Sequence, residues 1–161
     1  MKKLNETLVF ISVKTHLISS GWNLIGGQPP SGTDYLPVIE IRDPGYAGKG
    51  SKGSYKPDLI AWKKDTLMII ELKPTFDKHD RKKVNEVLNS KSRLESLWEA
   101  ILQRSIRIQD VTESRSFKEH GQIVGGLGYG GKPVEHPELW RFFVDTSGVE
   151  VRPGSFSTSL K

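Results

Sequence analysis

YKPDLIAWKKDTLMIIELKP, residues 55–74, is the stretch of sequence that decides the fold of this chain. Two apolar runs of strand character flank the polar step at Lys64, which predicts a β-hairpin that turns there. Such a hairpin places Asp58 directly opposite Glu71. Because like charges in a directly opposed pair destabilise a sheet, the stretch predicts that a cation neutralises them.

The same register brings a lysine to the two acids. It pairs Ile60 with Ile69, which keeps apolar side chains together on one face. Side chains alternate between the faces of a strand, so Lys73 shares a face with Glu71. Two carboxylates and an ammonium at one end of a hairpin predict a site for a divalent metal ion.

The composition favours a soluble globular protein. The chain has 161 residues, 35% hydrophobic and 27% charged, which suits one domain over 1–161, with 153–161 expected to fray. No apolar run approaches the roughly 18 residues of a membrane span, so we expect a cytoplasmic protein with no membrane partner. The absence of cysteine excludes disulfides and thiolate zinc sites.

Hydrophobic periodicity predicts the other elements. Helical spacing of apolar residues covers 4–20 and runs again from a helix start at Asp77 to Leu102, with a break near Ser90. We expect Pro74 to end the second strand of the hairpin. Further strands are expected over 22–25, 35–41, 105–111, 139–145 and 149–151, with a loop over 112–120 and a strand from 122 that dissolves into glycines before 131.

A basic, glycine-rich loop precedes the hairpin. The net charge of +5 and pI near 9.4 indicate a polyanionic partner. Residues 43–54, DPGYAGKGSKGS, would let backbone amides and lysines approach phosphates closely. Lys49, Lys52 and Lys56 are therefore candidates for contacts to a nucleic-acid backbone, although a solvated connector would have the same composition.

Two further acids have alternative interpretations. Glu6 lies in the first turn of the expected N-terminal helix, where it is either a solvated acid favoured by the helix dipole or a supporting metal ligand. Glu40 lies between two isoleucines, so it either faces solvent or joins the site on the face that carries Asp58.

Pro57-Asp58 followed by Glu71-Leu72-Lys73 resembles the PD-(D/E)xK signature of the restriction-endonuclease-like nuclease superfamily. The resemblance implies an α/β fold with a mixed central sheet flanked by helices, and a core of a helix, the hairpin, a second helix and a further strand. It implies that Asp58 and Glu71 bind Mg²⁺ together with the Leu72 carbonyl, with Mn²⁺ able to substitute. Lys73 would orient or activate the attacking water.

The resemblance implies a function as well. We expect a Mg²⁺-dependent endodeoxyribonuclease of restriction or defence type, which cuts double-stranded DNA to leave 5′-phosphate and 3′-hydroxyl ends. One site cuts one strand, so a homodimer or a partner subunit is expected, with specificity from loops such as 43–54 and 125–131. Alternatives are a junction or repair nuclease, a ribonuclease, and a non-catalytic nucleic-acid-binding subunit of a larger complex.

Overall fold

A computed structural model describes residues 4–30, 36–42, 54–104 and 111–161 of the protein, with the backbone alone over 111–115. Its elements in chain order are α1 (Glu6–Ser19), β1 (Asn23–Gly27), β2 (Ile41–Arg42), β3 (Ser54–Tyr55), β4 (Leu59–Lys63), β5 (Thr66–Thr75), α2 (Lys78–Leu88), α3 (Lys91–Arg104), α4 (Val111–His120), β6 (Gln122–Gly130), β7 (Trp140–Asp145) and β8 (Gly148–Arg152). No helix in these ranges is long and apolar enough to cross a membrane.

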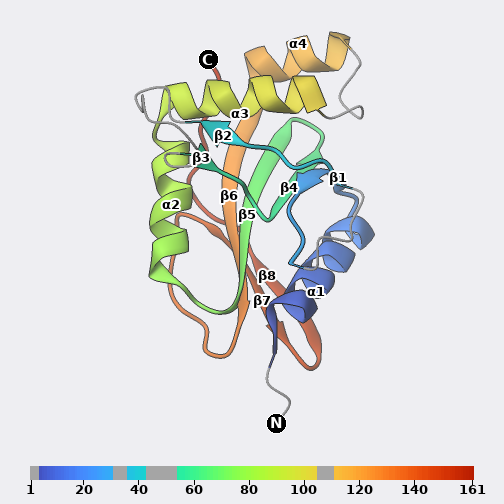
Figure 1. Ribbon diagram of the computed structural model, residues 1–161, viewed down its shortest axis with the longest axis vertical. Helices are drawn as coiled ribbons and strands as arrows, with labels where there is room; N and C mark the ends of the chain where they lie inside the picture. Colours follow the sequence, from blue (N-terminus) through green and yellow to red (C-terminus); the bar gives the residue numbers. More distant parts are fainter. Residues whose placement is uncertain (1–3, 31–35, 43–53, 105–110) are drawn as a thin grey trace.

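The fold is a mixed α/β architecture around a six-stranded sheet of order β1-β4-β5-β6-β7-β8 (Figure 1). Strand β6 runs parallel to both β5 and β7, and the other neighbouring pairs are antiparallel. The short strands β2 and β3 form a separate antiparallel pair. The parallel pair β5 and β6 is connected through three helices, as a crossover requires.

Helices cover both faces of the sheet. Helix α1 packs its buried side chains, such as Val13, against one face of β5 around Met68 and Ile70. Helices α2 and α3 lie over the other face, where Val84 packs in the same cluster as Ile69. Strand β5 is central and buried on both faces, which explains why its apolar run is nearly continuous.

The structure has the hairpin register that the sequence predicts. Ile60 pairs with Ile69, and Lys64 takes the left-handed conformation of the turn with φ 54°. The predicted N-terminal helix and the helix break near Ser90 are also confirmed, since α2 ends before this residue and α3 begins after it. Strand β5 continues through Pro74, which the sequence analysis placed at its end.

The expected loop over 112–120 is wrong, because helix α4 occupies Val111–His120. Its only described buried side chain is Phe117. The centroid of the Phe117 ring lies 4.7 Å from that of Trp62 and 4.8 Å from that of Trp98. Tertiary packing of one aromatic residue therefore stabilises a helix whose sequence carries no apolar stripe.

The prediction for the glycine-rich segment after Gln122 is also wrong. The strand was expected to end among the glycines, but β6 continues to Gly130. Its glycines lie where side chains of helices on the two faces of the sheet approach the strand closely. A Cβ at Gly125 would lie 2.4 Å from a Val84 methyl group, and one at Gly128 would lie 3.0 Å from a Val13 methyl group. Residues 125–130 are therefore part of the core and not part of a recognition loop.

Two other predicted segments differ from the structure. The residues expected to fray are held down, since Thr158 and Ile123 exchange backbone hydrogen bonds of 2.7 and 3.0 Å. The strand expected over 35–41 is reduced to Ile41–Arg42, while residues 36–40 carry no regular element. The strand expected over 105–111 falls mostly on 105–110, outside the described residues.

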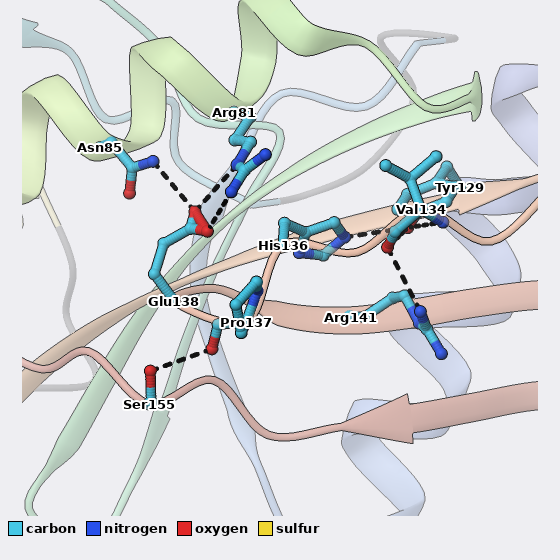
Figure 2. Close-up of polar contacts among 9 residues, drawn as sticks. All are labelled: Arg81, Asn85, Tyr129, Val134, His136, Pro137, Glu138, Arg141 and Ser155. Atoms are coloured by element: carbon cyan, nitrogen blue, oxygen red, sulfur yellow. Dashed lines mark hydrogen bonds and ion pairs between the residues drawn. The ribbon is translucent and has the colours of Figure 1, made fainter.

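Glu138 ties the connection between β6 and β7 to α2. Its carboxylate accepts hydrogen bonds of 2.5 and 3.0 Å from Arg81 and one of 3.2 Å from Asn85 (Figure 2). The Arg81 hydrogen bonds lower the pKa of Glu138 from 4.5 to about 2. A folded-state pKa below the unfolded one contributes stability above pH 4.5, which is lost as the pH falls towards 2.

Glu138→Gln is therefore expected to be less stable than the wild type at pH 7 and nearly equal to it at pH 2.5. Because water reaches both partners, we expect a difference of about 1 kcal/mol at pH 7. Urea unfolding at the two pH values measures it. The same change at Glu99, an exposed glutamate of α3, is the matched control and should change stability at pH 7 by no more than about 0.5 kcal/mol. An equal loss at both pH values would contradict the prediction.

Candidate functional site

The two acids of the motif meet at the end of the hairpin. Asp58 lies just before β4, and its Oδ2 accepts a hydrogen bond of 2.8 Å from the Leu72 backbone N–H. Glu71 is 5% exposed, and its Oε1 accepts a hydrogen bond of 2.5 Å from the Tyr55 hydroxyl. The two carboxyl groups lie close enough for the negative charge of Asp58 to raise the pKa of Glu71. The structure therefore brings together the pair that the register predicts.

Burial and mutual repulsion change the acidity of this pair. Burial, followed by the negative charge of Asp58, raises the pKa of Glu71 to about 9. Burial is also the largest cause of the raised pKa of Asp58. In the protein without a cation, one proton is consequently shared between the two carboxyl groups at neutral pH. A bound cation would reverse this, because it favours the ionised form of both groups.

Lys73 lies beside the pair on β5 and is partly open to solvent. Its Nζ lies 4.0 Å from Glu6 Oε1 on α1, and 40% of its side chain is exposed. Burial lowers the pKa of Lys73, but the negative charges of Asp80 and Glu6, then of the motif acids, outweigh it and raise the pKa. Lys73 is therefore a charged ammonium held among carboxylates. Glu6, whose role the sequence left open between a solvated acid and a metal ligand, lies next to this ammonium.

Asp80 is a site residue that the sequence analysis missed. It lies in the first turn of α2, is 5% exposed, and its Oδ2 is buried without a hydrogen-bond partner among the described residues. It lines a small cavity of about 10 Å³ together with Glu71 and Lys73. In the sequence, Asp80 indicates only the start of a helix, as an acid three residues after Asp77. The cap is Asp77, which accepts a 2.8 Å hydrogen bond from His79 N, so Asp80 is left to face the site.

The residues present suit an oxygen-liganded ion such as Mg²⁺. Asp58 and Glu71 offer carboxylate oxygens, and Leu72 offers a backbone carbonyl between Glu71 and Lys73. No group of three or more His, Cys, Asp or Glu side chains within the described residues is arranged to hold a metal. A site made of this pair would leave most coordination positions to water and substrate, as Mg²⁺ prefers.

The other candidate residues lie outside this cluster. Lys56 is exposed between β3 and β4, two residues before Asp58. Lys49 and Lys52 lie outside the described residues. The half-buried side chain of Glu40 makes no hydrogen bond or ion pair with any described residue, and its part in a metal site stays untested.

Comparisons with protein-family models, with curated proteins and with solved structures found no match to this chain. What the site does must therefore be inferred from its own residues.

Proposed function

We propose that the protein is a Mg²⁺-dependent endodeoxyribonuclease of the PD-(D/E)xK superfamily, with a restriction-endonuclease-like core. The gathering of Asp58, hydrogen-bonded to the Leu72 backbone, with Lys73 and the buried Glu71 at one end of the hairpin carries the proposal. Its chemistry is hydrolysis of a phosphodiester bond. The order of elements supports it, because α1, the β4–β5 hairpin, α2 and β6 follow each other as that core requires.

A purely structural role explains the pair poorly. The buried Glu71 and the half-buried Asp58 lose hydration and repel each other, and apolar residues at buried charged positions are often neutral or stabilising. The preceding positions 67–70 on β5, and Leu72 after Glu71, are buried apolar residues, so the sheet itself does not need an acid here. A cation that binds between the acids accounts for both of them, because its attraction to the carboxylates offsets the free-energy cost of their desolvation.

Each residue has a role in the proposed chemistry. Asp58 and Glu71, with the Leu72 carbonyl, would hold the ion, and Mn²⁺ would substitute for Mg²⁺. When bound, the ion would supply Lewis acidity to the scissile phosphate. Tyr55 fixes the orientation of Glu71 through its 2.5 Å hydrogen bond. Lys73 would orient the attacking water or stabilise charge that develops on the phosphate.

Asp80 and Glu6 act on Lys73 in this proposal. They lie on helices from opposite faces of the sheet, and the negative charge of each raises the pKa of Lys73. The ammonium is thereby kept protonated and in place beside Glu71. These two acids are positioning residues, because each acts through the lysine.

Double-stranded DNA is the proposed partner, approached in part through Lys56 and the positive net charge. One site cuts one strand, so we propose that a homodimer or a partner subunit supplies the second cut.

Plasmid DNA incubated with the purified chain tests the proposal. With Mg²⁺ or Mn²⁺ we expect cleavage that leaves 5′-phosphate ends, and no cleavage in EDTA or with Asp58→Asn. Glu95→Gln, which changes an exposed acid of α3, is the control and should cut normally. Full activity of Asp58→Asn would refute the proposal. The failure of calorimetry to detect Mg²⁺ binding that depends on Asp58 would favour a non-catalytic subunit.

A further inference from the structure

A second polar region lies on the face of the sheet covered by α2, beyond the candidate site. A cavity of about 350 Å³ opens between residues 134–139, which connect β6 to β7, and residues 152–155, which follow β8. Its walls are tied together, because the backbone N–H and the hydroxyl of Ser155 both donate to the Pro137 carbonyl, at 2.9 and 3.1 Å (Figure 2). The cavity is therefore shaped before any ligand arrives.

Two arginines line this cavity from adjacent strands. Arg141 on β7 is the direct cross-strand partner of Arg152 on β8. Like charges in directly opposed positions are destabilising, for the same reason that applies to Asp58 and Glu71. Two arginines at directly opposed positions of one cavity wall predict an anion, as two opposed acids predict a cation.

The positive charge of the Arg141 guanidinium has few partners among the described residues. The residue is 6% exposed, and its buried Nε has no hydrogen-bond partner among the described residues. Its Nη1 donates to the Val134 carbonyl at 3.3 Å and lies 3.8 Å from Oε1 of Glu135, whose side chain is 82% exposed. Leaving a buried charged donor unpaired costs more than leaving a neutral one.

The nearby acids do not neutralise the pair. Glu138 turns towards α2, where Arg81 and Asn85 hold it, while Arg141 lies apart on β7 (Figure 2). Among the described residues, the ion-pair partner of Arg152 is Glu150, whose Oε1 lies 3.4 Å from its Nε, and both side chains are 61% exposed. Exposed pairs of this kind contribute little to stability, so a stronger anion would displace them readily.

We propose that this cavity binds a phosphate group between Arg141 and Arg152. Guanidinium groups offer parallel N–H donors that match phosphate oxygens, and the buried Nε of Arg141 is a donor that a ligand would satisfy. The phosphate is a free ion, the end of a nucleic-acid strand or a link in its backbone. Binding by the cavity does not depend on whether the carboxyl pair cuts DNA.

The cavity also adjoins the candidate site. Tyr129 lines the small cavity that holds Glu71 and Lys73. Its hydroxyl lies 2.9 Å from Nε2 of His136, which lines the phosphate cavity. The hydrogen-bonded pair of Tyr129 and His136 therefore lies between the phosphate cavity and the small cavity of the candidate site.

Calorimetry in EDTA, where no metal-dependent cleavage occurs, tests the inference. The probes are sodium phosphate, a short oligonucleotide with a 5′-phosphate and the same oligonucleotide with a 5′-hydroxyl. We expect saturable binding of at least one probe, weakened about tenfold or more by Arg152→Gln, because a charge-assisted hydrogen bond is lost. Arg104→Gln removes the same charge at the exposed end of α3 and should bind as the wild type does.

The pattern of binding identifies the source of the phosphate. Preference for the 5′-phosphate indicates a strand end, equal binding of both oligonucleotides indicates the backbone, and binding of sodium phosphate alone indicates a free ion. Arg141→Gln serves as a second variant where circular dichroism shows that it folds. Failure of all three probes to bind, or equal binding by Arg152→Gln and Arg104→Gln, would overturn the inference.

Discussion

Glu71→Gln is expected to abolish Mg²⁺-dependent cleavage and, at the same time, to stabilise the metal-free protein at pH 8. The loss of activity should exceed about a hundredfold, because the substitution removes a direct ligand and even indirect supports of a metal site cost 10–100-fold. The gain in stability follows from the pKa of Glu71, which burial and Asp58 raise to about 9 in the folded protein.

The sign of the stability effect comes from proton linkage. Glu71 titrates at its ordinary value of 4.5 when unfolded and at about 9 when folded, so folding takes up a proton between these values. Wild-type stability therefore falls as the pH rises from 4.5 towards 9. Glutamine does not titrate, so we expect Glu71→Gln to be more stable than the wild type at pH 8.

Thermal unfolding of both proteins in EDTA between pH 5 and pH 8 measures this difference. The two midpoints should lie close together at pH 5 and separate at pH 8, with Glu71→Gln higher. Added Mg²⁺ should raise the midpoint of the wild type alone, since a ligand that binds only the folded state stabilises it. A variant that is inactive and also less stable at every pH would indicate that Glu71 supports the sheet and not a metal ion.

The hairpin could be predicted from sequence because local rules determine it. Alternation of side chains and the position of the turn specify the register, and a slip of one residue would move every side chain to the opposite face of the sheet. Asp58 and Glu71 were therefore identified together. Asp80 could not be found in this way, because it reaches the site only when α2 packs across the sheet and places its first turn beside Lys73.

The pair of arginines illustrates the same limit. Arg141 lies in one expected strand, 139–145, and Arg152 directly follows the next, 149–151, so their pairing was open to inference. The cavity was not, because it needs the segment after β8 to fold back on Pro137 through Ser155. Residues 153–155 of that segment had no periodic pattern and were expected to fray. Hydrophobic periodicity predicts local elements, and it does not predict contacts between segments that are distant in the sequence.

The glycine-rich strand β6 and helix α4 escaped prediction for opposite reasons. Glycines normally end a strand, but here Gly125 and Gly128 make room for side chains of α2 and α1. The sequence of α4 lacks a repeating apolar stripe, so it resembled a polar loop. In both segments tertiary contacts override local preference.

Phe117→Ala is expected to cost about 3–5 kcal/mol of unfolding free energy, the range for removing a fully buried phenylalanine. The ring is 1% exposed and lies 4.7 Å from Trp62 and 4.8 Å from Trp98. Its removal leaves a cavity between two tryptophans that cannot collapse without moving α3 or β4. Because α4 has no other described buried side chain, we expect the helix to detach before the sheet unfolds.

Urea unfolding followed by tryptophan fluorescence measures the loss, because both indole rings that contact Phe117 report on this packing. Lys118→Ala is the matched control. It removes an exposed side chain from the same helix and should change stability by no more than about 0.5 kcal/mol. If α4 were the polar loop that the sequence indicates, Phe117 would lie in solvent and the two variants would be equally stable. A large difference between them would instead show that one aromatic contact holds the helix to the sheet.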